Sequence, residues 1–134
     1  MATFTKRPVQ VEIRRAEGVE EIETREGTVY AKEEDGDLVA MGVEGDVYPI
    51  GPRILAQTYA PATDEAREIY EECLPTGVRV EFDDTGDATT AHAVYVVPDE
   101  ISTDEEREAA ERFVRKFIAS SPHLRGNGAE VPYA

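Results

Sequence analysis

The sequence predicts an α+β fold, with a small bent antiparallel sheet or partial barrel at the N-terminus and a C-terminal α-β-β-α layer. In the first sixty residues, apolar and polar residues alternate between closely spaced turn signals, which is typical of short strands. After residue 61, two segments with helical apolar spacing enclose two segments that read as strands. We therefore expect a β-rich module over residues 1–60, an α-β-β-α segment sharing one core over 61–119, and a flexible tail over 120–134.

The expected strands of the N-terminal module are separated by turns. Val9, Val11 and Ile13 alternate with polar residues and predict the first strand. Pro49 and Pro52 remove ladder donors, so the last strand should lie at a sheet edge or a bend. Residues 54–57 predict one helical turn. The other expected strands are 21–25, 28–32, 38–43 and 46–50, with turns at Glu26-Gly27, Asp35-Gly36 and Glu44-Gly45.

Thr63 is a predicted N-cap for the next helix, since acidic residues fill the first turn after it. Pro75, Thr76 and Gly77 end this helix. Residues 78–82 alternate, and residues 90–97 return as a second strand after a polar turn, so the two segments predict a hairpin. The apolar face expected for the helix consists of Ala66, Ile69, Tyr70, Cys73 and Leu74.

The last helix begins at a capping box, formed by Ser102 with Glu105 or by Thr103 with Glu106. Its acidic residues come first and its basic residues last, as the helix dipole favours. The wide apolar stripe predicts that this helix is central to the core. The stripe consists of Ala109, Ala110, Phe113, Val114, Phe117 and Ile118.

The composition indicates the solvent in which the chain works. Its 29 acidic and 14 basic residues give a formal net charge of −15, and only Lys6, Lys32 and Lys116 are lysines. This lysine-poor, acidic composition resembles that of haloarchaeal cytoplasmic proteins, in which molar salt screens the repulsion between acids. We expect a cytoplasmic protein without signal peptide or membrane association, because the longest apolar run covers only residues 93–97.

The charge balance also argues against nucleic acid as a partner, because nucleic-acid binding depends on basic residues that neutralise phosphates. Both local basic clusters fit ordinary structural positions. Arg14 and Arg15 lie in an expected strand, and Arg112, Arg115 and Lys116 lie near a helix C-terminus, where the dipole favours them.

Residues 23–59 read ETREGTVYAKEEDGDLVAMGVEGDVYPIGPRILAQTY. This stretch resembles the PGDYG-type domain, a small bacterial and phage module of uncharacterised function. Asp35 replaces the usual proline and Leu38 the usual aromatic residue. The resemblance implies a compact β-rich module and no particular activity. The matching residues are Glu26-Gly27-Thr28, Gly36-Asp37, Gly42-Val43, Gly45, Tyr48-Pro49 and Thr58-Tyr59.

Asp37, Tyr48 and Tyr59 would be the binding residues if this motif forms a contact surface. The alternative is that Asp37 makes a turn hydrogen bond and that the tyrosines pack with solvated hydroxyls. This second interpretation is favoured, because such roles are common for these residue types in turns and strands.

The remaining reactive residue types fit structural roles. Asp83, Asp84 and Asp87 lack the spacing of a calcium loop. His92 suits a solvent-facing strand position better than a general-base role beside a carboxylate. His123 lies in the expected tail, and Cys73 lies on an apolar helix face. We expect no metal and no cofactor.

The leading functional hypothesis is a non-enzymatic binding or protein-interaction module in a high-salt cytoplasm, with a protein as its partner. The alternative is a small carboxylate-dependent hydrolase that uses an Asp or Glu near His92. The sequence contains no serine elbow, phosphate-binding loop, HExxH motif or dinucleotide-binding glycine pattern. An enzyme would require groups that converge in a concave site.

Overall fold

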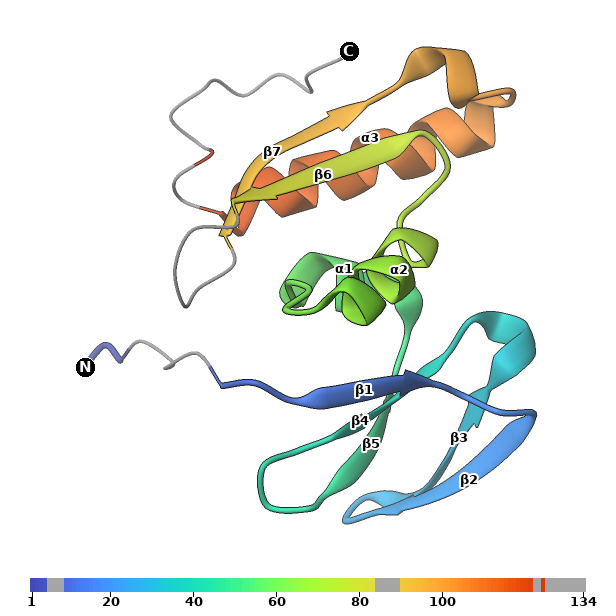
Figure 1. Cartoon of the computed structure of the whole chain (residues 1–134), viewed down its shortest axis with the longest axis vertical. Coiled ribbons are helices and arrows are strands. Elements are labelled where there is room, and N and C mark those ends of the chain that lie inside the picture. The colour runs from blue at the N-terminus through green and yellow to red at the C-terminus, as the bar shows by residue number, and fades with distance from the viewer. Residues whose placement is uncertain (5–8, 84–89, 122–123, 125–134) are drawn as a thin grey trace. The chain divides into compact units, whose positions relative to one another are not determined.

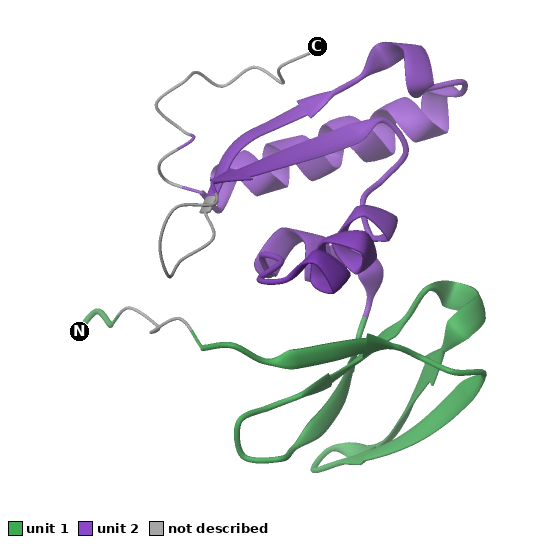
Figure 2. Ribbon diagram, in the orientation of Figure 1, with its two compact units in different colours: residues 1–50 green, residues 51–134 purple. Residues whose placement is uncertain are grey.

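The computed structural model describes residues 1–4, 9–83, 90–121 and 124 (Figure 1). The predicted α+β fold is confirmed: the described residues form three helices and seven strands in small antiparallel sheets, with no closed barrel among them. The chain comprises two compact units, residues 1–50 and 51–134 (Figure 2). This division places the first helix in the second unit, whereas the sequence analysis puts the boundary at residue 60.

The first unit consists of a three-stranded sheet in the order β1-β4-β5 and a two-stranded sheet, β2-β3. The β2-β3 hairpin turns at Glu26-Gly27, as predicted. The predicted turn at Asp35-Gly36 is a 3-10 turn, η1, closed by Gly36 at a φ of 74°. The elements are β1 (Glu12–Arg15), β2 (Val19–Thr24), β3 (Gly27–Lys32), η1 (Glu33–Asp35), β4 (Leu38–Met41) and β5 (Val47–Ile50).

The small core of this unit lies where the two sheets meet. Val39 on β4 packs in one buried cluster with Ala16, with Ile22 on β2 and with Ala31 on β3. The inward residues alternate along β2 and β3, as in strands with one face packed on a core. Pro49 pairs with Val39 on the outer strand β5, and the prediction that it lies at an edge is therefore confirmed.

The second unit follows the predicted α-β-β-α order, preceded by one further helix. Residues 54–57 belong to a longer helix than predicted, because Pro52 at its first turn and Tyr59 at its C-cap extend it. The elements are α1 (Pro52–Thr58), α2 (Asp64–Glu72), β6 (Val78–Asp83), β7 (Thr90–Val96), the 3-10 turn η2 (Pro98–Glu100) and α3 (Asp104–Ala119).

Helix α1 joins the other two helices of this unit through side-chain hydrogen bonds. The Tyr70 hydroxyl on α2 donates to the Ala56 carbonyl at 2.7 Å, and Gln57 Nε2 donates to the Phe113 carbonyl on α3 at 3.1 Å. Tyr70 also packs edge-on against Phe82 of β6, with ring centroids 5.1 Å apart. Burial raises the pKa of Tyr70 above its usual range.

Helix α3 is a central part of the core, as predicted. Thr103 and Glu106 form the capping box, and the backbone N–H of Ser102 lowers the pKa of Glu106 by hydrogen bonding. The stripe is buried at Ala110, Phe113, Val114 and Phe117, while Ile118 is half-buried and Ala109 is exposed. Most of the predicted tail lies outside the described residues, but Leu124 is buried.

Candidate functional site

The three sequence-predicted binding residues do not belong to one unit. Asp37 directly precedes β4 and Tyr48 lies in β5, both within residues 1–50, and Tyr59 is the C-cap of α1 in the second unit. Asp37 closes the η1 turn, since its carboxylate accepts from the Lys32 N–H at 3.0 Å. Its backbone carbonyl accepts from the Ala16 N–H at 3.0 Å.

Asp37 thus has the turn role that the sequence analysis favoured, and both tyrosines are half-buried. The binding role of Asp37, Tyr48 and Tyr59 stays a prediction. The β4-β5 hairpin that carries Tyr48 has a second feature of interest at its tip.

The tip of the β4-β5 hairpin exposes apolar side chains on a well-defined turn. Met41 and Val47 are cross-strand partners, and Val43 lies in the turn between them with 74% of its surface exposed. The Gly42 N–H donates to the Asp46 carbonyl at 2.8 Å, which fixes the ends of the turn. A Cβ atom on Gly42 would lie only 2.3 Å from the Asp46 carboxylate, so a larger residue here would require the exposed Asp46 side chain to move.

We define the apolar tip as Met41, Val43 and Val47. Among the described residues, every exposed large hydrophobic side chain except Ile54 lies in residues 1–50. Scattered exposed apolar residues are normal, but three of them on one short turn form a local patch. The sequence analysis identified Gly42, Val43 and Gly45 through the family resemblance but did not recognise this exposure.

A second cluster lies on the exposed face of the β6-β7 hairpin. His92 Nδ1 is 3.1 Å from an Asp83 carboxylate oxygen, and His92 Nε2 is 3.3 Å from a Glu81 carboxylate oxygen. The Tyr95 hydroxyl donates to Glu81 at 3.0 Å, which raises the pKa of Tyr95. The imidazole therefore lies between two carboxylates, one of which also accepts from a tyrosine.

A β-bulge creates this cluster. Glu81 pairs with Ala93 and Phe82 pairs with Ala91, so His92 is an extra residue in β7. Val94 is buried, and strict alternation would therefore bury His92 as well. The bulge instead turns His92 to the solvent-exposed face and Ala91 into the core.

The chemistry available to this cluster is limited by solvent. The side chains of His92, Glu81 and Asp83 are each about half exposed. Solvent therefore competes for the hydrogen bonds of these side chains. The electrostatic interaction between the imidazole and the two carboxylates is weakened by this exposure. No group of three His, Cys, Asp or Glu residues in the described ranges is placed to hold a metal ion.

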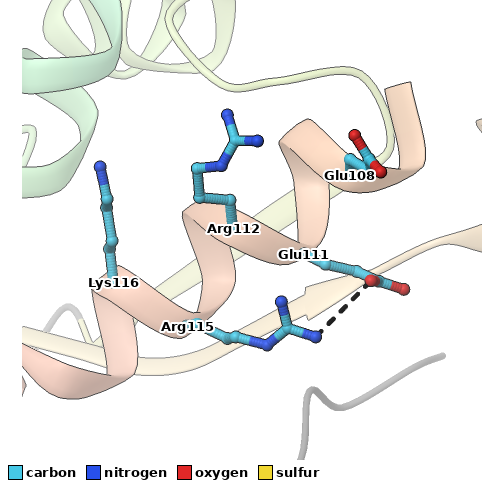
Figure 3. A pocket seen from close by; sticks show the side chains of 5 residues that line it. All are labelled: Glu108, Glu111, Arg112, Arg115 and Lys116. Atoms are coloured by element: carbon cyan, nitrogen blue, oxygen red, sulfur yellow. Dashed lines mark ion pairs between the residues drawn. The ribbon is translucent and has the colours of Figure 1, made fainter. Parts of the chain in front are cut away.

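The remaining sequence candidates have structural roles or lie outside the described residues. Cys73 is buried at the C-cap of α2, and its carbonyl accepts a hydrogen bond of 2.6 Å from Arg53. Asp84, Asp87 and His123 lie outside the described residues. A hollow of about 430 Å³ lies along α3, and charged side chains of that helix line it: Glu108, Glu111, Arg112, Arg115 and Lys116 (Figure 3).

No known protein family, curated protein or solved structure matches this chain. The resemblance to the PGDYG-type domain therefore stays a prediction. Within the part of the chain that the structure describes, no helix is long and apolar enough to span a membrane.

Proposed function

We propose that this chain is a non-enzymatic protein-interaction module of a high-salt cytoplasm, and that the apolar tip is its main contact. The observation that supports the proposal is a hydrogen-bonded turn that exposes Met41, Val43 and Val47 on a chain with a net charge of −15. A preorganised turn loses little conformational entropy when it binds. The partner it fits is a protein with a complementary apolar pocket or groove.

The solvent favours this kind of contact. At about 1 M salt the Debye length is about 3 Å, so attraction between distant charges is largely lost. Burial of apolar surface does not depend on charge and is strengthened by several salts. The acidic residues Glu44 and Asp46 beside the tip would form the polar rim that surrounds the apolar centre of many interfaces.

Affinity capture from a lysate at about 2 M KCl tests the proposal. The natural chain, the variant Met41→Ser/Val43→Ser and the control Ile54→Ser are used as baits. Ile54 is the exposed large hydrophobic residue outside residues 1–50 in the described part of the chain, so its variant removes a similar surface elsewhere. We expect a stoichiometric partner to be captured by the natural chain and the control, and lost with the tip variant. Equal capture by all three baits would contradict the proposed contact.

The cluster around His92 supports the second candidate, a carboxylate-dependent hydrolase, because Glu81 and Asp83 lie within contact distance of the imidazole. A screen of ester, phosphoester and glycoside substrates with the natural chain, His92→Gln and Glu81→Gln tests it. Turnover that both variants abolish would favour the enzyme over the interaction module.

A further inference from the structure

The exposed face of α3 carries charges in a self-complementary order. Acidic residues occupy the first half of this face and basic residues the second half. Figure 3 shows the central part of the face, where Arg112 and Lys116 extend to the same side of the helix. The six residues that define the charged face are Asp104, Glu105, Glu108, Arg112, Arg115 and Lys116.

Helix geometry places these six residues on one side. With 3.6 residues per turn, they fall within an arc of about 120° around the helix axis. All six are exposed. The opposite side of α3 carries the buried residues Ala110, Phe113, Val114 and Phe117. The charged face is therefore separate from the face that α3 uses within its own unit.

The charges at the centre of this face are not neutralised within the described structure. Glu111 and Arg115 form an ion pair at 3.6 Å one turn apart, whereas Glu108 and Arg112 have the same spacing and form none. Arg112 and Lys116, also one turn apart, have no ion-pair partner among the described residues. Placing two like charges at this spacing disfavours the isolated helix.

The helix dipole accounts for only part of this pattern. Its effect falls off within the first and last turns, so it favours Asp104 and Glu105 at one end and Lys116 at the other. Glu108 and Arg112 lie in the middle turns of a helix of 16 residues. Their charges follow the same acidic-to-basic order although the dipole has little effect on the middle turns. The dipole therefore does not explain the charge order at Glu108 and Arg112.

We propose that the charged face binds the same face of a second copy of this chain, with the two α3 helices antiparallel. A two-fold axis that crosses the charged face at the level of residue 110 along the helix places Glu108 of one copy opposite Arg112 of the other. The same axis brings together Glu105 with Lys116 and Asp104 with Arg115. Because the interface is isologous, each pair occurs twice, and every charge of the face faces an opposite charge.

The spacing along the helix supports this register. Glu105 and Lys116 lie five and six residues from Ala110, which is about 7.5 and 9 Å at 1.5 Å per residue. Both also lie on the same side of the face, so their long side chains can meet across the interface.

Association depends on salt in a defined direction. At about 0.1 M salt the Debye length is about 10 Å, so the ion pairs attract, acids of the two copies within that distance repel, and charges farther apart are screened. At about 1 M salt the Debye length of about 3 Å weakens the pairs themselves, so the dimer is a low-salt state of the chain and not its state in a high-salt cytoplasm. Exposed ion pairs are individually weak, so we expect a dimer with a dissociation constant of about 0.1–1 mM at the lower salt.

Sedimentation equilibrium of single and mixed variants tests the proposal. Glu108→Arg makes both central positions of the charged face, 108 and 112, basic. Arg112→Glu makes both positions acidic. We expect each variant alone to be a monomer at about 1 mM, and an equimolar mixture to form a heterodimer. The double variant Glu108→Arg/Arg112→Glu exchanges the two charges and should dimerise again. Arg107→Glu, which reverses a charge of α3 outside this face, is the control and should leave dimerisation unchanged.

Circular dichroism of each variant confirms that α3 is folded, so that loss of the dimer is not loss of the helix. A natural chain that is monomeric at about 1 mM at both salt concentrations overturns the proposal. So does a mixture of the two single variants that remains monomeric while the natural chain dimerises. A monomer that binds a single-stranded oligonucleotide only when Arg112 is present would overturn it in favour of an anion site. The experiment does not involve the apolar tip, so its outcome is independent of the proposed function.

Discussion

Arg14 and Glu20 hold the corner between β1 and β2 through two parallel hydrogen bonds of 2.7 Å each. The Glu17 N–H also donates to Glu20 at 2.7 Å. The hydrogen bonds from Arg14, and then that from Glu17, lower the pKa of Glu20 to about 2. At the residue scale, this bidentate pair is the best-defined charged contact of the first unit.

The lowered pKa of Glu20 predicts a contribution to stability that depends on pH. The folded carboxylate stays charged down to about pH 2, while the ordinary value is 4.5. The contribution is therefore present above 4.5 and is lost as the pH falls from 4.5 to 2. We expect Glu20→Gln to destabilise the chain at pH 7 and to have little effect near pH 2, by denaturant titration. Glu23→Gln, on the same strand, is the control. A destabilisation by Glu20→Gln that persists near pH 2 would show that the effect is not charge-dependent.

Tyr70 predicts a second effect at the residue scale. Its buried hydroxyl donates to the Ala56 carbonyl, so Tyr70→Phe leaves a buried acceptor without this donor. We expect a loss of about 1–3 kcal/mol in the free energy of unfolding, because the ring packing against Phe82 is retained. Tyr95→Phe, which removes an exposed hydroxyl of the same kind, should cost less than about 1 kcal/mol. Equal losses in the two variants would indicate that burial of the Tyr70 hydroxyl is not important.

At the scale of elements, the bulge in β7 predicts an asymmetry between two deletions. Deleting His92 leaves Ala91 and Ala93 as neighbours and gives a regular ladder with Phe82 and Glu81. Deleting Tyr95 instead breaks the alternation that buries both Val94 and Val96.

We expect deletion of His92 to change the free energy of unfolding by less than about 1 kcal/mol. Deletion of Tyr95 should lower this free energy by about 1.5–3 kcal/mol or abolish the cooperative transition. Thermal melts followed by circular dichroism measure both. A stronger effect of deleting His92 would mean that its contacts with Glu81 and Asp83 stabilise the hairpin.

Most elements could be predicted because their signals are local. The capping box at Thr103 and the turn residues at Gly27 and Gly36 act on their immediate neighbours, and the structure confirms all three. The bulge at His92 could not be predicted, because residues 90–97 read as one unbroken strand, and the bulge appears only in its pairing with β6. The exposure of Val43 could not be predicted either, because it depends on how the strands of the first unit pack around the β4-β5 hairpin.

At the scale of the whole molecule, the net charge of −15 predicts that salt stabilises the fold. Repulsion among the acids extends about 10 Å at 0.1 M salt and about 3 Å at 1 M. We expect the melting temperature to be higher at about 2 M KCl than at about 0.1 M KCl. Sucrose at matched water activity is the control, because it is excluded from the protein surface but does not screen charges. A melting temperature that is equal in the two salt concentrations would show that the acids do not limit stability.

Cys73 gives the second unit a built-in probe of its own opening. It is the only cysteine of the chain and it is buried at the C-cap of α2, so a thiol reagent reacts with it only when that part of the chain opens. The labelling rate then measures the free energy of the opening that exposes Cys73 within residues 51–134, whereas circular dichroism follows both units. If labelling and the loss of ellipticity share one midpoint in denaturant, the units unfold as one cooperative body. If labelling requires more denaturant, the first unit unfolds earlier, and the chain could be cut between them without loss of the second.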